Sequence, residues 1–269
     1  MPKPFLKRDA SPEELRENIL STYLSLRIGI AVLGIAFPWI LLIGGRYWAH
    51  LCLQHSMSAY YRATIFDGRS MRDEFVGLLF AVGVFLYLYK GYSTAENWAL
   101  NAAGGLAIGV ALFPMPWKAS CDLRICKGAP ALPLMSCSGP KFSIHGFCAI
   151  TFFLCIAFVC LFCADNTLTL IPDQKLRERF KAAYKTIGLA MIGSMIAAYV
   201  LNTAIPTGQK AFWVETAGIT SFGAYWLTKT VELKTSAAEP KALRGQLARI
   251  KGYVVDVSSP TPENTLLHP

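Results

Sequence analysis

Long apolar stretches separated by polar segments run along almost the whole chain. Six of them are long enough to cross a bilayer, because a helix rises about 1.5 Å per residue and a hydrocarbon core is about 30 Å thick. They cover residues 26–45, 75–92, 96–115, 144–164, 184–204 and 211–231. The pattern therefore predicts an all-α, polytopic integral membrane protein with six transmembrane helices.

Composition favours this class over a soluble one. Of the 269 residues, 54% are hydrophobic and only 16% are charged, which is more apolar surface than a single soluble core of this length would use. A soluble protein would have to bury these runs in core helices, which rarely contain apolar runs of such length. We therefore expect the surplus apolar side chains to face lipid.

Basic residues predict the orientation of the spans. The first 25 residues are largely polar, and Ser11-Pro12-Glu13-Glu14 has the pattern of a capping box with proline at the first helical position. We expect residues 1–25 to form a cytoplasmic amphipathic segment. With both termini in the cytoplasm, 17 of the 26 lysines and arginines lie on that side, as positive charges do in membrane proteins.

The segment after the last span, residues 232–269, contains four prolines among small and charged residues. Chains with few large apolar side chains cannot bury enough surface to fold alone. We expect a disordered cytoplasmic tail and no second folded domain. The net charge of +9 fits contact with anionic headgroups, so we expect membrane lipids as partners and no nucleic acid.

The eight cysteines form two groups with different chemistry. Four of them, Cys148, Cys155, Cys160 and Cys163, lie in the fourth span, where cysteine packs as a small apolar residue. Cys121, Cys126 and Cys137 share an outer loop, and in an oxidising compartment two of them can form a disulfide, leaving the third for Cys52. Their spacing matches no common zinc motif, and we assign no metal site.

Four ionisable side chains are predicted to lie at one depth near the outer face: His55, Asp73, His145 and Glu215. Charged groups at membrane depth are costly unless they are paired or line an aqueous cavity. Two imidazoles and two carboxylates can supply the acid and base for hydrolysis of a lipid, so these four are the candidate catalytic residues. The alternative is that they are unrelated interfacial residues.

The order of several motifs resembles that of bacterial six-span membrane proteins of unknown function related to the DRAM/FRAG/Sfk-like family. The motifs are Ser56-Met-Ser-Ala-Tyr-Tyr61, Arg72-Asp73, Ile108-Gly-Val-Ala-Leu-Phe-Pro114, Ile144-His-Gly146 and Phe212-Trp-Val-Glu215. The resemblance implies a six-helix fold in a bacterial inner membrane and lipid-related work. A second comparison, with the zinc-dependent ceramidase and progestin-receptor superfamily, offers Ser58, Asp73, His55 and His145, but the paired histidines of a late span are missing.

Three classes of function remain. The first is a noncatalytic protein, either a structural or accessory subunit or a bundle that senses lipids or partners, and for it we expect a protein partner or an oligomer. The second is a lipid-directed membrane hydrolase that uses the four outer-face residues. The third is a small-solute transporter with a polar path past Asn101 and Asn202. No cofactor is assigned, because a pigment, quinone or lipid held by packing would leave no motif.

Overall fold

The computed structural model describes residues 11–62, 71–116, 143–204, 210–250 and 253–258, which are mostly helical. The α-helices are α1 Pro12–Tyr47, α2 Met71–Leu88, α3 Thr94–Leu112, α4 Ile144–Phe158, α5 Gln174–Ala204, α6 Lys210–Ser236 and α7 Ala238–Leu243. Between them lie the 3-10 helix η1 Met57–Arg62, the π-helix η2 Val159–Cys163 and the 3-10 helix η3 Ala164–Leu170. Two short strands follow, β1 Leu247–Ile250 and β2 Tyr253–Asp256.

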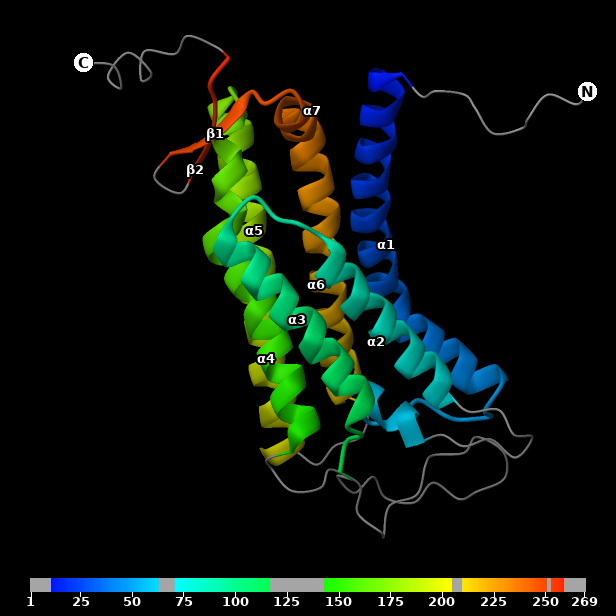
Figure 1. The fold of residues 1–269 in the computed structure, drawn as a ribbon. Helices are drawn as coiled ribbons and strands as arrows, with labels where there is room; N and C mark the ends of the chain where they lie inside the picture. The colour runs from blue at the N-terminus through cyan, green and yellow to red at the C-terminus, as the bar shows by residue number, and fades with distance from the viewer. Residues whose placement is uncertain (1–10, 63–70, 117–142, 205–209, 251–252, 259–269) are drawn as a thin grey trace, which may run out of the picture.

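The six long helices form a ring in which each packs against the next. Contacts run in sequence order from α1 to α6, and α6 packs back against α1. Figure 1 shows neighbouring helices running in opposite directions, with the start of α1 and the β1–β2 hairpin at one end and η1 at the other. We call these the hairpin end and the η1 end of the bundle.

Local sequence features explain where the helices begin and bend. Ser11, Ser93 and Ser143 each accept a hydrogen bond from the backbone N–H three residues later, at 3.0–3.1 Å, and so cap α1, α3 and α4. Pro38 lies inside α1, where it has no N–H to donate to the preceding turn. Figure 1 shows α1 changing direction in its second half, as a proline kink requires.

Two glycines allow α2 and α3 to approach closely. A Cβ atom on Gly83 would lie 2.7 Å from the carbonyl oxygen of Gly104, and one on Gly104 would lie 2.6 Å from that of Gly83. No side chain fits at either position without moving a helix backbone. The contact holds the two helices together along their middle turns, between the two ends of the bundle.

Large apolar side chains cover the outside of the bundle on all six long helices. Examples that are at least 40% exposed are Ile28, Val32, Val84, Tyr87, Trp98, Leu112, Ile150, Leu154, Ile196, Tyr199, Leu227 and Val231. Arg27, Glu96, Lys229 and Glu232, by contrast, are at most 1% exposed. A protein dissolved in water has the opposite distribution, which therefore favours a lipid environment.

Three helical segments within the described residues are long and apolar enough to cross a membrane, judged by length and composition. They are Pro12–Tyr47, Ile144–Leu170 and Gln174–Leu201. The expected helical fold is confirmed, and these three helices are candidate membrane spans. α2, α3 and α6 coincide with the other expected spans but are not among these three; α2, for instance, is only 18 residues long and includes Arg72, Asp73 and Glu74 in its first turn.

The segment after the sixth expected span is folded over its described residues, contrary to the disordered tail expected from composition. α6 continues to Ser236, α7 follows, and β1 pairs antiparallel with β2 so that Leu247 lies opposite Asp256. Val254 packs in a small cluster with Leu170 and Leu233. Composition was misleading here because the few apolar residues of this segment are buried against the bundle and need no core of their own.

The expected amphipathic segment at the N-terminus is not a separate element in its described part. Residues 1–10 lie outside the described residues, and from Pro12 onward the chain belongs to α1 without a break. The capping serine was predicted correctly, but the helix that it begins is the same helix that contains the first expected span.

Candidate functional site

The 3-10 helix η1 lies at the η1 end and is tied to α6 by two hydrogen bonds. The backbone N–H of Phe212 donates to the carbonyl oxygen of His55 at 3.0 Å. The backbone N–H of Met57 donates to Oε2 of Glu215 at 2.7 Å. These two contacts hold the chain on both sides of Ser56 and thereby determine the position of the next polar side chain, Ser58.

Tyr60 anchors η1 in the apolar core at this end. Its side chain is fully buried, and its ring centroid lies 6.1 Å from that of Phe212. A Cβ atom on Gly45 would lie 2.4 Å from the Tyr60 ring, so only glycine fits at this position of α1. Burial raises the pKa of the Tyr60 phenol, which therefore stays neutral.

Ser58 and His145 form the closest pair of reactive side chains at the η1 end. Ser58 Oγ lies 2.9 Å from Nε2 of His145, and Nδ1 of the same ring lies 2.8 Å from the carbonyl oxygen of Phe113. A carbonyl oxygen can only accept, so Nδ1 carries the proton of the neutral ring. Nε2 is then the acceptor, and the Ser58 hydroxyl donates to it. This is the arrangement of a nucleophile beside an oriented base.

The end of α3 makes the Phe113 carbonyl available to His145. α3 stops at Leu112, and Phe113 has an extended backbone as the C-cap residue. Pro114 follows and cannot continue the helix. The last carbonyl groups of a helix have no partner within it, so the Phe113 oxygen is free to accept from a side chain of the next helix. His145 lies in the first turn of α4, where it meets this oxygen.

An open hollow of about 370 Å³ lies at the same end of the bundle, between η1, α2 and the end of α3, and neither Ser58 nor His145 is among its lining residues. Its lining includes Tyr61 from η1, Arg72 and Asp73 from α2, and Leu112 from α3. The Arg72 guanidinium carbon lies 5.0 Å from the centre of the Tyr61 ring, at cation–π distance. One positive and one negative side chain thus line the hollow, next to residues of η1 and of the end of α3.

The four residues singled out from the sequence are brought to the η1 end in different ways. His145 and Glu215 both contact η1, the first through Ser58 and the second through the backbone of the preceding residue. Asp73 is exposed on the wall of the hollow. His55 reaches α6 through its backbone carbonyl, and burial lowers the pKa of its imidazole. The four side chains therefore share one end but do not form a single cluster, and the residue that completes a pair is Ser58.

The cysteines follow the two expected groups as far as they are described. Cys148, Cys155, Cys160 and Cys163 are free thiols in α4 and η2. Cys52, in the loop before η1, is disulfide-bonded, with its partner outside the described residues. Cys121, Cys126 and Cys137 also lie outside the described residues, so their expected disulfide stays a prediction.

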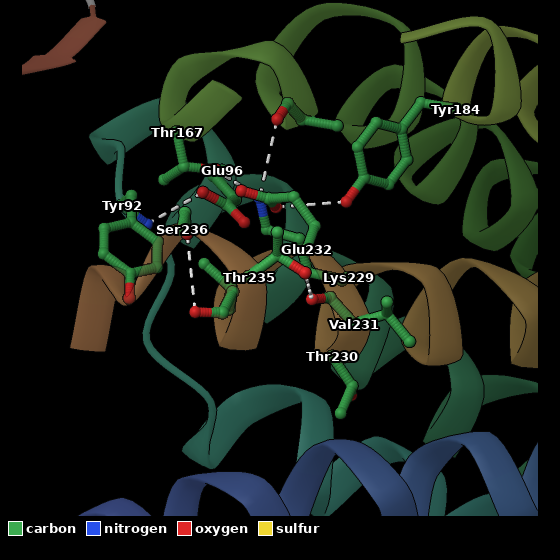
Figure 2. A network of polar contacts seen from close by, with 12 residues as sticks. Tyr92, Glu96, Thr167, Tyr184, Lys229, Thr230, Val231, Glu232, Thr235 and Ser236 are labelled. Atoms are coloured by element: carbon green, nitrogen blue, oxygen red, sulfur yellow. Dashed lines mark hydrogen bonds and ion pairs between the residues drawn. The ribbon is translucent and has the colours of Figure 1, made fainter. Parts of the chain in front are cut away.

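A second polar site, which the sequence analysis did not identify, lies at the hairpin end. Figure 2 shows its central side chains, with Lys229 and Glu232 from α6 among groups from three other segments. Lys229 Nζ lies 2.7 Å from Oε2 of Glu232 and donates to Oγ1 of Thr167 at 2.8 Å. The hydroxyl of Tyr184 donates to the same Glu232 oxygen at 3.1 Å. Lys229 and Glu232 thus form a buried, hydrogen-bonded ion pair.

A change of helix type after α4 provides the partners of Lys229. The chain passes from α4 into the π-helix η2 and then into the 3-10 helix η3, and such changes disturb the regular pairing of carbonyl groups. The Ala164 carbonyl, at the start of η3, lies 3.5 Å from Lys229 Nζ, and Thr167 in the next turn supplies its hydroxyl. Both acceptors therefore come from irregular helix.

Glu96, in the first turn of α3, is the third charged residue of this site. Its Oε2 accepts from the backbone N–H of Tyr92 at 2.8 Å, and it interacts electrostatically with Lys229 and Glu232. A Cβ atom on Gly91 would lie 2.4 Å from the Glu96 carboxyl carbon, so glycine is required where the chain folds over this carboxylate. Oε1 of Glu96 has no hydrogen-bond partner among the described residues.

A second ion pair at the hairpin end connects α1 to α7. Both terminal nitrogens of Arg27 in α1 donate to the carboxylate of Glu239 in α7, in a bidentate arrangement. The Arg27 side chain is 1% exposed and that of Glu239 is 16% exposed. Such a pair has fixed geometry and holds α7 against the start of the bundle.

Sequence reasoning missed the hairpin-end site because each of its residues had a simpler local explanation. Glu96 completes a capping box after Ser93, and Lys229 and Glu232 lie at the end of an apolar run, where charges usually meet water. One sequence feature could have revealed them: Lys229 and Glu232 are three residues apart on one face of a helix, the spacing of an ion pair within a helix.

No protein-family model, curated protein or solved structure matches the chain. Function is therefore inferred from the geometry at the two ends of the bundle.

Proposed function

We propose that all six long helices span the membrane, in the order and positions expected from the apolar stretches. The support is that every one of them presents large exposed apolar side chains, while charged residues are buried between them. In the ring, α2, α3 and α6 also lie next to helices that are apolar enough to span by themselves. Helices packed side by side around one core share one environment, so the bundle crosses the bilayer as a unit.

The proposed orientation places the hairpin end in the cytoplasm of a bacterium and the η1 end outside. Of the 26 lysines and arginines, 17 lie in the segments that this orientation makes cytoplasmic. The disulfide of Cys52 lies in the loop before η1, and disulfides persist in oxidising compartments outside the cytoplasm. The resemblance of the motif order to the DRAM/FRAG/Sfk-like family would imply the same six-span arrangement.

At the outer end we propose a lipid-directed hydrolase in which Ser58 is the nucleophile and His145 the general base. The observation that carries the proposal is the 2.9 Å contact between Ser58 Oγ and His145 Nε2, with the tautomer set by the Phe113 carbonyl. In serine hydrolases the base is oriented in the same way by a third group, usually a carboxylate. Here the orienting group is a backbone carbonyl.

The chemistry needs only groups at this site and water. Ser58 Oγ attacks the carbonyl carbon of an ester while its proton passes to Nε2 of His145. The C–O bond to the alcohol breaks, and the alcohol leaves with that proton, so that an acyl-serine remains. Water then attacks the acyl carbon, gives its proton to His145, and the Ser58 oxygen leaves and takes the proton back. The products are a carboxylic acid and an alcohol.

We infer the class of substrate from the hollow at the same end of the bundle. Its volume of about 370 Å³ lies in the range of small-molecule sites, and its wall contains both Arg72 and Asp73. A zwitterionic phospholipid headgroup carries a phosphate and an ammonium group, which match these two charges. We therefore expect an ester of a zwitterionic phospholipid to be a better substrate than one of an anionic phospholipid.

The second candidate is the noncatalytic protein expected first from the sequence. One observation favours it: the two hydrogen bonds of His145 connect η1, α3 and α4, which is also what a purely structural cross-link would do. In that case the bundle would bind lipids, a protein partner or another copy of itself through its exposed apolar surface, without turnover.

The test uses the full chain in nanodiscs of phosphatidylethanolamine and phosphatidylglycerol, treated with a fluorophosphonate probe that modifies only activated serines. We expect one modified serine, Ser58, identified by peptide mass spectrometry, and release of fatty acid mainly from phosphatidylethanolamine. Ser58→Ala and His145→Ala should abolish both readouts. The matched control is Ser56→Ala, because the Ser56 hydroxyl is buried two residues away and touches neither member of the pair.

Two results would decide against the hydrolase. A folded wild-type protein that neither takes up the probe nor releases fatty acid has no activated serine, and the noncatalytic function then becomes the conclusion. Labelling at another serine, with Ser58→Ala unaffected, would also exclude this site. His145→Asn shows whether loss of labelling is chemical or structural, because asparagine retains hydrogen-bonding groups but cannot act as a base.

A further inference from the structure

The charged groups at the hairpin end do not balance. Four charged side chains at this end are at most 1% exposed, Arg27, Lys229, Glu96 and Glu232, and a fifth, Glu239, pairs with Arg27. The Lys241–Asp256 pair is more exposed and is neutral by itself. Arg27 pairs with Glu239, and Lys229 pairs with Glu232. Glu96 remains without a cation of its own, so with all five groups ionised the site would carry one excess negative charge in the bundle interior. Such a charge is costly at membrane depth unless something neutralises it.

The two carboxylates beside Lys229 differ in how well their charge is compensated. Glu232 has Lys229 Nζ at 2.7 Å and the Tyr184 hydroxyl at 3.1 Å on the same oxygen. Glu96 has one neutral donor, the Tyr92 N–H, on Oε2. Oε1 has no partner among the described residues in either carboxylate, so the difference lies in the ion pair that Glu232 has and Glu96 lacks. A proton on Oε1 of Glu96 would remove the excess charge and leave both existing interactions in place.

We propose that the hairpin end is a proton-binding site in which Glu96 carries one exchangeable proton, and that α7 and the β1–β2 hairpin control its access to the cytoplasm. A second observation points to the same place. The hydroxyl of Tyr225, fully buried on α6, interacts electrostatically with Glu96 and has no hydrogen-bond partner among the described residues. It supplies a polar neighbour for a protonated carboxyl group.

The C-terminal segment covers this site through several contacts. Besides the Arg27–Glu239 pair, the Thr169 hydroxyl donates to the carbonyl oxygen of Val254, and Arg249 donates to that of Tyr92. Because the N–H of Tyr92 donates to Glu96, a single residue connects the carboxylate to the cover. Opening of the cover would admit water to Glu96, which then loses its proton more easily. Closing it would favour uptake.

Other ionisable groups surround Glu96 from every neighbouring element. Those that act on it directly are Tyr89 at the end of α2, Tyr92 before α3, Cys163 on η2, and Tyr225, Lys229 and Glu232 on α6. Tyr184 on α5 acts on Glu232, and Arg27 on α1 and Glu239 on α7 act on Tyr89 and Tyr92. Lys229 is the cation that acts most strongly on Glu96. It is already shared with Glu232, so it does not remove the imbalance.

The experiment is infrared difference spectroscopy of the full chain in nanodiscs, which detects the carbonyl stretch of a protonated carboxylic acid. Glu215 is a second buried carboxyl group, so all variants are made in a Glu215→Gln background. We expect one protonated-carboxyl band at neutral pH that is lost in Glu96→Gln and weakened as the pH rises. Glu232→Gln should also weaken it, because removal of that carboxylate frees Lys229 to neutralise Glu96, whereas Asp165→Asn should keep it. Far-UV circular dichroism of each variant checks that the bundle is folded.

Three outcomes would overturn the proposal. The first is absence of the band in a folded protein at neutral pH, and the second is a band that survives Glu96→Gln. The third is a band that appears only when sodium and potassium are replaced by choline, because an alkali cation and not a proton would then neutralise the site. The result does not depend on the outer-face hydrolase, whose failure would leave the band unchanged.

The role of the cover has its own readout in the same instrument. Transfer into D₂O shifts the band as the proton is replaced, and the rate of the shift reports access to Glu96. We expect Glu239→Gln, which breaks the bidentate pair with Arg27, to speed this exchange at least severalfold. The control is Asp165→Asn at the Lys181–Asp165 pair, which is exposed and lies outside the cover. Equal rates in the wild type and Glu239→Gln would refute the gating part of the proposal.

Discussion

The two ends of the bundle differ in the kind of polar groups that they bury and in how these groups are paired. At the η1 end, Ser58 and His145 meet as neutral partners whose hydrogen bonds are completed by the carbonyl of Phe113, and an open hollow lies at the same end. At the hairpin end, formal charges are buried together and covered by α7 and the hairpin. Neutral hydrogen bonds cost little to assemble, whereas buried charges depend strongly on every partner.

Because of this difference, we expect a reaction with a substrate at the η1 end and the binding of a proton at the hairpin end. An open site with an oriented base allows a substrate to enter and leave. A closed site with an unbalanced carboxylate favours binding of one small positive species. Substitutions at the two ends should therefore differ in how much they destabilise the fold.

The largest effect is expected at the hairpin end. Lys229→Met leaves Glu232 buried without its cation, which should lower the free energy of unfolding by about 3–5 kcal/mol. The measurement is denaturant or thermal unfolding of the purified protein in detergent. The double variant Lys229→Met, Glu232→Gln should recover much of the loss, because it removes the isolated charge. If the single and double variants are equally unstable, the ion pair is not the cause.

A smaller effect is expected at the η1 end. Glu215→Leu removes the acceptor of the Met57 N–H and leaves that buried donor unsatisfied, at a cost of about 1–3 kcal/mol. Glu215→Gln keeps an acceptor oxygen and should cost less than Glu215→Leu. The same unfolding assay measures both. A larger loss in the glutamine variant would mean that Glu215 acts here through its charge, and the contrast between the two ends would fail.

The close contact between α2 and α3, midway between the two ends of the bundle, should be sensitive to substitution at Gly83 and Gly104. Gly83→Ala forces a methyl group against the Gly104 carbonyl, and this overpacking should lower the free energy of unfolding by about 1–3 kcal/mol. The better helix propensity of alanine should offset about 1 kcal/mol of that loss. Gly105→Ala is the matched control, since a Cβ there meets nothing within 4 Å. It should be neutral or stabilising. Equal effects at the two positions would show that α2 and α3 do not pack as described.

The smallest effect concerns the cover alone. Lys241 pairs with Asp256 at 3.0 Å, and hydrogen bonds from the Ser258 hydroxyl and from Lys241 lower the pKa of Asp256 to about 2. A carboxyl group with a lowered pKa stabilises the fold above its ordinary value of 3.8, and this contribution is lost as the pH falls toward 2. Hydrogen exchange of residues 253–258 should therefore increase between these pH values in the wild type.

Asp256→Asn serves as the control for that titration. It should show the faster exchange already at neutral pH and respond little to acid in this range. High salt should have a similar but weaker effect on the wild type, because the pair is partly exposed and screened. An acid response that persists unchanged in Asp256→Asn would assign the titration to another group.

The positions of the six long helices follow from local sequence. Runs of apolar residues, the capping serines Ser11 and Ser93 and the kinking Pro38 act within a few residues of chain, so their consequences can be derived without tertiary structure. The sequence also located His145 and Glu215 at one end, because depth follows from position within a span. It did not show that Ser58, 87 residues before His145, is the partner of the ring, since that contact depends on how η1 lies across the bundle.

Which charged side chains are buried depends on the tertiary structure and could not be derived from local sequence. Glu96 caps a helix whether or not it is buried, and Lys229 with Glu232 would be ordinary charges at the end of a helix in water. They become a buried site because α6 packs against α1 and α5, η3 supplies Thr167, and the folded C-terminal segment covers them. Burial is a property of segments far apart in the chain, and the free energy of a charge depends on burial far more than on its local sequence.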